Sequence, residues 1–199
     1  MKSVILYFGS FNPVHKGHMA VAERVLEGGL CDEVWFVVSP QNPLKRDGSL
    51  IGEEDRLEMV RLAAATSRFP ERMQACDAEF FMPRPSYTVD TLERLRALYS
   101  DVKFSLLVGS DIPQQITQWK EWRTLLDDYD IYVYPRRGYP APAAGGAFIP
   151  LEGAPFEDYS STEVRRALTG GEGGDMVPDA VGKYIERRGL WNTGKISKD

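Results

Sequence analysis

The chain contains 199 residues, of which 43% are hydrophobic and 27% are charged, as in an ordinary globular protein that buries its own core. Its 24 basic and 29 acidic side chains give a formal net charge of −5, which argues against nucleic acid and against a membrane surface as partners and leaves only local binding of phosphate. The lack of an apolar run near the roughly 20 residues that span a bilayer, and of a visible signal peptide, favours a cytoplasmic protein.

The chain opens on an apolar run at 4–8, which we expect to be a strand, followed by a glycine-containing turn and a helical pattern at 17–26. Further strands are expected at 33–38, 73–76, 103–108, 130–134 and, briefly, 147–149. Further helices are expected at 53–67, 89–98, 114–126, 160–168 and 178–187. Thr88 is a candidate N-cap for the helix at 89–98, and Ser160 with Glu163 has the spacing of a capping box. A long surface loop is expected within 138–155 because Gly, Ala and Pro are frequent there.

The alternation of strands and helices predicts an α/β fold. Right-handed crossovers narrow it to a Rossmann-like doubly wound parallel sheet, with a small helical part at the C-terminal end. We expect a single domain over residues 1–191 and a polar tail at 192–199. Ligands of such sheets bind at the carboxyl ends of the strands, beside the point where the strand order reverses. The segments that follow predicted strands and are expected to meet there are 9–18, 39–45, 109–111 and Arg136.

The chain has only two histidines, His15 and His18, and both lie where a glycine turn leads into a helix. Free backbone N–H groups and the helix dipole make such a turn an anion site. The imidazoles can donate hydrogen bonds to phosphate oxygens and, near their pKa, add positive charge. No Ser or Cys nucleophile in a known elbow accompanies them, and no third metal ligand is evident, so no protein metal site is expected. Cys31 and Cys76 are far apart and are expected to be reduced thiols.

Two segments of the sequence resemble the signatures of one superfamily, the nucleotidyltransferase α/β-phosphodiesterases. The run Gly-Ser-Phe-Asn-Pro-Val-His-x-Gly-His at 9–18 resembles the first signature, HxGH, and Ser-Thr-x-Val-Arg at 161–165 resembles the second. Within the superfamily the chain is similar to the bacterial nicotinate mononucleotide adenylyltransferases. Their middle motifs match at 85–92, 109–111, Trp119 and 136–139. The resemblance extends over nearly the whole chain.

The resemblance implies transfer of the adenylyl group of ATP to nicotinate mononucleotide, which yields deamido-NAD and pyrophosphate in NAD biosynthesis. The mononucleotide phosphate would attack the α-phosphorus directly, so the protein would align two anions and neutralise the charge that develops. The implied catalytic residues are His15, His18 and Arg165, the last of which would hold the β- and γ-phosphates. The implied ATP-binding residues are Gly9, Ser10, Phe11, Asn12, His15, His18, Gly109, Asp111, Arg136, Ser161, Thr162 and Arg165.

The implied mononucleotide-binding residues are Lys45, Ser86, Tyr87, Thr88, Asp111 and Trp119. Trp119 would stack on the pyridinium ring, whose positive charge favours an indole face, whereas Trp122 is expected in the core. Asp111 would accept hydrogen bonds from ribose hydroxyls or from Thr88, and Gly109 would let the nucleotide approach its strand. Mg²⁺ is the implied cofactor, held largely by ATP oxygens and water.

Other functions make different demands on the sequence. A nicotinamide mononucleotide adenylyltransferase stays open because Ser10 and Asn12 suit both enzymes, although the middle segment favours the acid; another HxGH enzyme, such as one acting on phosphopantetheine, also stays open. A nicotinamide-dependent dehydrogenase would need G-x-G-x-x-G after the first strand, and a P-loop kinase would need G-K-[ST]; the sequence has neither. A non-catalytic nucleotide-binding protein would tolerate loss of either histidine, whereas both are present here. The oligomeric state stays open.

Overall fold

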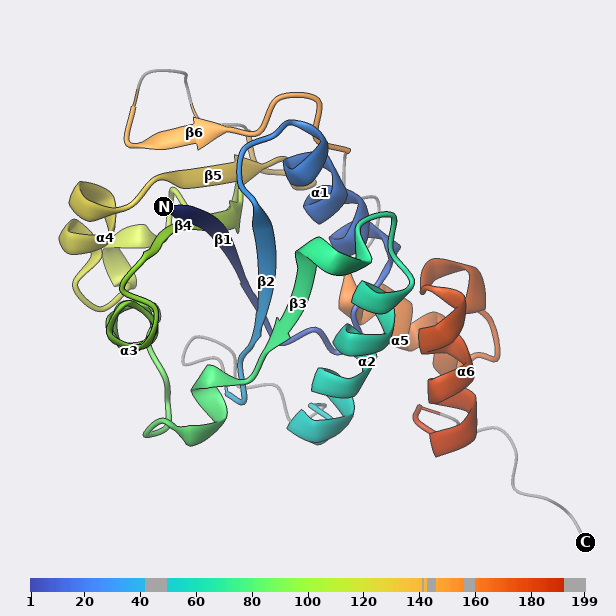
Figure 1. Cartoon of the computed structure of the whole chain (residues 1–199). Coiled ribbons are helices and arrows are strands. Elements are labelled where there is room, and N and C mark those ends of the chain that lie inside the picture. The colour runs from blue at the N-terminus through green and yellow to red at the C-terminus, as the bar shows by residue number, and fades with distance from the viewer. Residues whose placement is uncertain (42–49, 141, 143–145, 156–159, 192–199) are drawn as a thin grey trace, which may run out of the picture.

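The computed structural model describes residues 1–41, 50–140, 142, 146–155 and 160–191 (Figure 1). Within them, strands pair in one parallel sheet of order β3-β2-β1-β4-β5-β6. The strands are β1 (Lys2–Gly9), β2 (Glu33–Val38), β3 (Met73–Cys76), β4 (Val102–Gly109), β5 (Ile131–Tyr134) and β6 (Phe148–Pro150). The order reverses between β1 and β4, so the predicted doubly wound Rossmann-like sheet is confirmed. The predicted tail at 192–199 lies outside the described residues.

Strand β1 lies between β2 and β4 in the middle of the sheet. Successive side chains of a strand point to opposite faces, and both faces of this sheet are covered. Val4, Ile5, Leu6 and Tyr7 are therefore all buried. Ile5 and Tyr7 belong to one core cluster, and Val4 and Leu6 belong to the other. The sheet thus needs a continuous apolar run here, which is the pattern that the sequence shows.

Helices cover the two faces of the sheet (Figure 1). The described helices are α1 (Lys16–Glu27), α2 (Glu53–Ala65), α3 (Thr88–Leu98), α4 (Trp122–Asp128), α5 (Ser161–Thr169) and α6 (Asp179–Arg188). Short 3₁₀ turns are η1 (Pro70–Arg72), η2 (Ala78–Phe81), η3 (Ile116–Gln118) and η4 (Gly174–Met176). Buried side chains of α1, α2, α5 and α6 join the first core cluster, and those of α3 and α4 join the second. Helices α5 and α6 form the predicted small C-terminal helical part.

The predicted helix at 114–126 is not continuous. The structure has η3 and α4 in its place, separated by Trp119 in an extended conformation and by Glu121 in the left-handed region with φ of 50°. A left-handed residue cannot continue a right-handed helix, so the chain turns before α4 begins. Trp122 was expected in the core, but it is half-buried and its ring lies under the guanidinium of Arg123 at 4.4 Å.

Of the two predicted helix caps, one is confirmed and one is wrong. Ser160 and Glu163 form the predicted capping box at the start of α5. Thr88, however, is the first residue of α3, and Tyr87 occupies the N-cap position without a side-chain hydrogen bond. The carbonyl of Tyr87 accepts instead from the backbone N–H and the hydroxyl of Thr91, one turn later.

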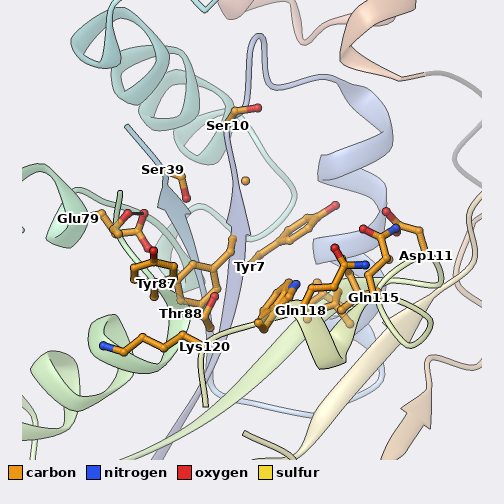
Figure 2. Close-up of a pocket in the computed structure, with 18 of the residues that line it drawn as sticks. Tyr7, Ser10, Ser39, Glu79, Tyr87, Thr88, Asp111, Gln115, Gln118 and Lys120 are labelled. Carbon is orange, nitrogen blue, oxygen red and sulfur yellow. Dashed lines mark hydrogen bonds between the residues drawn. The ribbon is translucent and has the colours of Figure 1, made fainter. Parts of the chain in front are cut away.

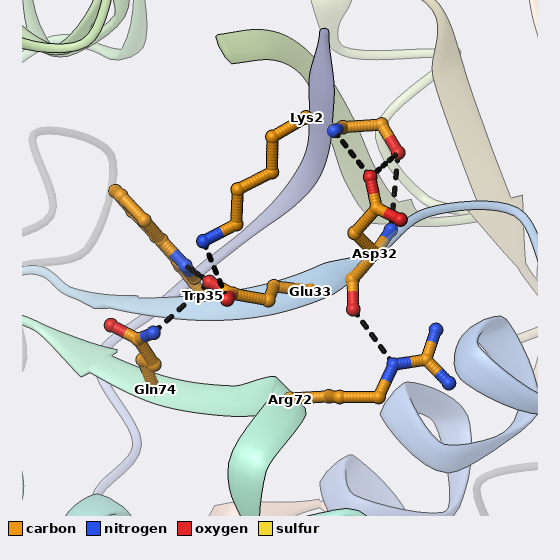
Figure 3. A network of polar contacts seen from close by, with 7 residues as sticks. Lys2, Asp32, Glu33, Trp35, Arg72 and Gln74 are labelled. Atoms are coloured by element: carbon orange, nitrogen blue, oxygen red, sulfur yellow. Dashed lines mark hydrogen bonds and ion pairs between the residues drawn. The ribbon is translucent and has the colours of Figure 1, made fainter.

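A polar network fastens the amino end of the sheet (Figure 3). The carboxylate of Asp32 accepts from the backbone N–H of Ser3 at 2.7 Å and from its hydroxyl at 2.8 Å, which lowers the pKa of Asp32. Arg72 donates to the carbonyls of Asp32 and Cys31, both at 2.8 Å. These contacts lie at the amino ends of β2 and β3, away from the carboxyl ends of the strands, where ligands of such sheets bind.

Cys31 and Cys76 are both free thiols, as predicted.

Candidate active site

A cavity of about 350 Å³ lies at the carboxyl ends of β1 and β4, where the strand order reverses. Figure 2 shows Tyr7 between the side chains at the start of α3, Tyr87 and Thr88, and those that follow β4. The lining residues are Tyr7, Phe8, Gly9, Ser10, Ser39, Glu79, Ser86, Tyr87, Thr88, Leu107, Val108, Gly109, Asp111, Ile112, Gln115, Gln118, Trp119, Lys120, Tyr134 and Arg136. The cavity therefore lies where the sequence predicted the binding loops to meet.

The two histidines form the N-terminal cap of α1. His15 is the N-cap residue, and its Nδ1 accepts from the backbone N–H of His18 at 3.4 Å. His18 is the third helical residue, and its Nδ1 accepts from the backbone N–H of His15 at 3.2 Å. The rings stack with their centroids 3.6 Å apart. The spacing of the signature is thus that of a capping box in which imidazoles replace the usual hydroxyl and carboxylate.

This geometry fixes the protonation of His15. Burial and the nearby positive charge of Arg136 lower the pKa of His15 to about 3, so its ring is neutral at pH 7. Its Nδ1 accepts a hydrogen bond, so the single proton of the neutral ring lies on Nε2. His15 in this structure is therefore a neutral imidazole, and its Nε2 atom is buried. The cause is its 1% exposure, which the sequence does not reveal.

Helix α5 is fastened to the loop that precedes α1. The hydroxyl of Ser161 donates to the carbonyl of Pro13 at 3.1 Å. The guanidinium of Arg165 donates to the carbonyl of Asn12 at 2.9 Å and to the hydroxyl of Thr162 at 3.2 Å. Both predicted signatures therefore come together, although about 150 residues separate them in the chain.

Two residues of the 9–18 segment serve mainly to shape it. Phe11 is 2% exposed, has a φ of 44°, and packs edge-on against Tyr7 and His18. A side chain at Gly9 would place its Cβ 2.9 Å from the Phe11 ring, so a glycine is required there. Asn12 is buried, and its Oδ1 accepts from the backbone N–H of Ile51 at 3.4 Å. The side chains of Phe11 and Asn12 therefore hold the loop from within.

At the carboxyl end of β4, the side chains of Arg136 and Asp111 lie over Gly109. The guanidinium of Arg136 is 3.3 Å from a carboxylate oxygen of Asp111. A Cβ at Gly109 would lie 2.3 Å from Arg136 and 2.5 Å from Asp111. Glycine at this position thus makes room for the ion pair. The pair also means that Asp111 is bonded to Arg136 and not to Thr88 within the described residues.

Glu79, which sequence reasoning missed, lies beneath the predicted mononucleotide site. It is 2% exposed, and its two oxygens accept from the hydroxyls of Ser86 at 2.6 Å and Thr91 at 2.9 Å. Tyr87 is exposed beside it, and the amine of Lys120 lies 5.5 Å from the Tyr87 ring. Glu79 thereby ties η2 to the start of α3. A lone carboxylate between two phenylalanines and an alanine gives no sequence signal of this role.

Trp119 lies at the cavity as predicted. It is half-buried, packs against the second core cluster and has its Nε1 buried. Within the described ranges this Nε1–H has no hydrogen-bond partner. Lys45, the remaining predicted site residue, lies outside the described residues.

Two negative findings concern the described part of the chain. It holds no cluster of three His, Cys, Asp or Glu side chains able to bind a metal ion. In the same ranges, no helix has the length and apolar character needed to cross a membrane.

Comparison with known proteins shows the family to which the chain belongs. Residues 6–167 match the family described as cytidylyltransferase-like. The chain is 34% identical to a probable nicotinate-nucleotide adenylyltransferase of Flavobacterium johnsoniae, over 94% of this chain and 97% of that protein. It is 42% identical to a protein with the same description from Cytophaga hutchinsonii, over 82% and 84%.

A solved structure shares the fold. It is the nicotinic acid mononucleotide adenylyltransferase of Plasmodium falciparum complexed with NaAD, with a TM-score of 0.82 at 20% identity over 98% of this chain and 99% of that one. The signatures, the topology and the length of the matches agree, and the chain belongs to the cytidylyltransferase-like family, among the bacterial nicotinate-nucleotide adenylyltransferases.

Proposed function

We propose that this chain is a cytoplasmic enzyme of NAD biosynthesis, with residues 1–191 as its single domain. It transfers the adenylyl group of ATP to nicotinate mononucleotide, which gives nicotinate adenine dinucleotide and pyrophosphate. The observation that carries this proposal is that Arg165 is bonded to the 9–18 segment, which also carries His15 and His18 and whose first residues line the cavity at the switch point. That arrangement offers N–H donors and a cation to phosphates, next to space for a second nucleotide.

In the proposed reaction the protein acts by alignment and electrostatics. An oxygen of the mononucleotide phosphate forms a bond to the α-phosphorus of ATP, while the bond from that phosphorus to the bridging oxygen of pyrophosphate breaks. The Nε2–H groups of His15 and His18 donate to the phosphate oxygens on which negative charge grows. Arg165 holds the β- and γ-phosphates in a fork of N–H donors. The first turn of α1 has no acidic residue, so its free N–H groups assist.

The second substrate lies across β1 in this proposal. The indole of Trp119 stacks on the pyridinium ring, and its buried Nε1–H is available to the ligand. The first N–H groups of α3, at Thr88 and Val89, face the ring carboxylate, which a helix N-terminus favours. Arg136 lies on the side of the adenine, held in place by Asp111.

The residues at the cavity fit a Mg²⁺ ion that ATP brings with it. Such an ion usually keeps several waters and is bound through one or two carboxylates together with substrate phosphates. Asp111 and Glu79 both line the cavity, but the oxygens of Asp111 already accept from Arg136 and those of Glu79 from hydroxyls, so the ion would be held largely by ATP oxygens and water, with Asp111 as a ligand through water. When bound, the ion supplies positive charge to the pyrophosphate oxygens.

The proposal is tested by measuring pyrophosphate release from ATP and Mg²⁺ with nicotinate mononucleotide, nicotinamide mononucleotide or phosphopantetheine as acceptor. We expect the highest kcat/KM with nicotinate mononucleotide. A higher value with the amide would overturn the acid specificity alone. Release of pyrophosphate with phosphopantetheine but with neither mononucleotide would overturn the proposed function.

A further inference from the structure

Arg56 of α2 is a buried charged residue that the proposed reaction does not use. It is 1% exposed and lies on the core-facing side of its helix, in line with Met59, Val60 and Ala63. Its hydrogen bonds within the described part of the chain all go to backbone carbonyl oxygens. The acceptors are Ser10 at 2.6 Å, Ser39 at 2.7 Å, Pro40 at 3.2 Å and Ile51 at 3.2 Å.

Three of these acceptors, Ser10, Ser39 and Pro40, lie just beyond the ends of β1 and β2, and the fourth, Ile51, lies just before α2. The pairing of the two strands ends at Gly9 and Val38, with one further bond from the Ser39 N–H to the Gly9 carbonyl at 2.9 Å. Past that point Nη1 of Arg56 joins the carbonyls of Ser10 and Ser39. The guanidinium thus connects the segments that follow β1 and β2, beyond the last hydrogen bond between the two strands. Ser10 and Ser39 both line the cavity, so this connection fixes part of its wall.

The charge of Arg56 also bears on the site. Glu53, the acidic residue one turn earlier, is paired with Arg84 at 2.7 Å. Burial lowers the pKa of Arg56 to about 10, which leaves it protonated at pH 7. The peptide that follows Ser10 is trans, so its N–H points away from the carbonyl that Arg56 binds. The positive end of this peptide dipole therefore faces away from the guanidinium.

We propose that Arg56 is a positioning residue for ATP. It holds the loop after β1 against the loop after β2 and places a fixed positive charge behind the loop that carries the two histidines. This inference rests on the proposed function, in which that loop binds the phosphates of ATP. Loss of the guanidinium would leave the buried carbonyl of Pro40 and three part-buried carbonyls without these donors, and the loop would move to satisfy them.

The test compares Arg56→Lys, Arg56→Met and a control, Asp55→Asn. Lysine keeps the charge but is a compact ammonium with three donors that cannot reproduce the planar fork. Asp55 is the neighbouring residue and accepts from Tyr184 at 2.7 Å and from Arg188 at 3.1 Å, so its substitution weakens the packing of α6 and leaves the loops alone. Calorimetry gives the Kd for α,β-methylene-ATP and for nicotinate mononucleotide, at a temperature where thermal melts show each protein folded.

We expect Arg56→Lys to raise the Kd for α,β-methylene-ATP by about tenfold or more, the loss typical of a hydrogen bond to a charged group. The Kd for nicotinate mononucleotide should change less than about threefold, and Asp55→Asn should lower the Tm without changing either Kd. Arg56→Met, if folded, should bind the analogue no better than the lysine variant. An unchanged Kd for the analogue in Arg56→Lys, or equal losses for both ligands, would overturn the inference. Since binding of the analogue needs no turnover, an inactive wild type would refute the proposed function separately.

Discussion

His15 and His18 each use one ring nitrogen for the fold, and in the proposed function the other would donate to a phosphate. Their Nδ1 atoms accept the backbone N–H groups that begin α1. The same bonds direct a ring proton to Nε2, since a neutral imidazole has one donor and one acceptor. The same two hydrogen bonds therefore cap the helix and orient the proposed phosphate donors. A substitution can separate them only if it replaces one nitrogen at a time.

Two variants of His18 make this separation. The oxygen of asparagine can take the place of Nδ1, and the amide of glutamine can take the place of Nε2. We expect His18→Asn to keep the stability of the wild type but to lose about 10²- to 10³-fold in kcat, the cost of removing one transition-state donor. His18→Gln should retain more of kcat and lose about 1 kcal/mol of unfolding free energy with the cap. Steady-state kinetics and urea unfolding measure both quantities.

Lys16→Ala is the control, because Lys16 is the exposed first residue of α1. It should change neither kcat nor stability by more than a small factor. Equal kcat values for His18→Asn and the wild type would contradict the role of the Nε2–H group.

At the level of residues, the sequence identified groups with an obvious chemical signature and missed those defined by burial. The histidines and Arg165 stand in recognisable patterns, and the structure brings them together. Arg56 and Glu79 have no motif, although Arg56 interrupts an apolar face at the spacing of Met59 and Val60. A charged residue on such a face is the signal that could have found it. The neutral state of His15 depends on desolvation, which only the folded chain determines.

At the level of elements, the site is built where the starts of two helices meet. Helix α1 begins in the 9–18 segment, and α5 is bonded to the same segment through Ser161 and Arg165. Because α5 is only a few turns long, its tertiary contacts and its cap must stabilise it. Val164 is its one fully buried residue, so the capping box of Ser160 and Glu163 carries much of this task.

Substitution of the cap tests this dependence. We expect Ser160→Ala to lower the free energy of unfolding by about 1 kcal/mol, since the backbone N–H of Glu163 loses its acceptor. The KM for ATP should rise severalfold, because Arg165 is held less firmly, and the KM for the mononucleotide should not change. Thr169→Ala is the control, as its hydroxyl donates to the carbonyl of Arg165 at the other end of the helix. An equal effect of both variants on the KM for ATP would contradict the special role of the cap.

Helices and strands with regular apolar patterns were predicted well, and the segment around Trp119 was not. The strand at 33–38 matches β2 residue for residue, since a strand buried on both faces leaves a continuous apolar run. The break before α4 arises from Glu121 in the left-handed region, a conformation that glycine usually signals and glutamate does not. This break lies beside the cavity, where the backbone departs from regular helix and places Trp119 at its wall.

For the whole molecule, the topology of the sheet brings the distant motifs to one edge. Strands β1 and β4 are neighbours with their carboxyl ends aligned, so the loops that follow them diverge and open the cavity. The alternating pattern of the sequence was sufficient to predict a doubly wound parallel sheet and the place of the site, and the structure adds the strand order. The shape of the cavity depends on side chains such as Arg136 over Gly109, which the pattern of strands does not determine.

The central claim is that this site transfers an adenylyl group directly between two bound nucleotides, with no covalent bond to the protein. The most direct test follows the configuration of the α-phosphorus, with ATP made chiral at that atom and the dinucleotide product analysed by ³¹P NMR. A single in-line displacement by the mononucleotide phosphate predicts inversion of configuration. Retention would require two displacements through an adenylylated residue and would contradict the roles given to His15, His18 and Arg165.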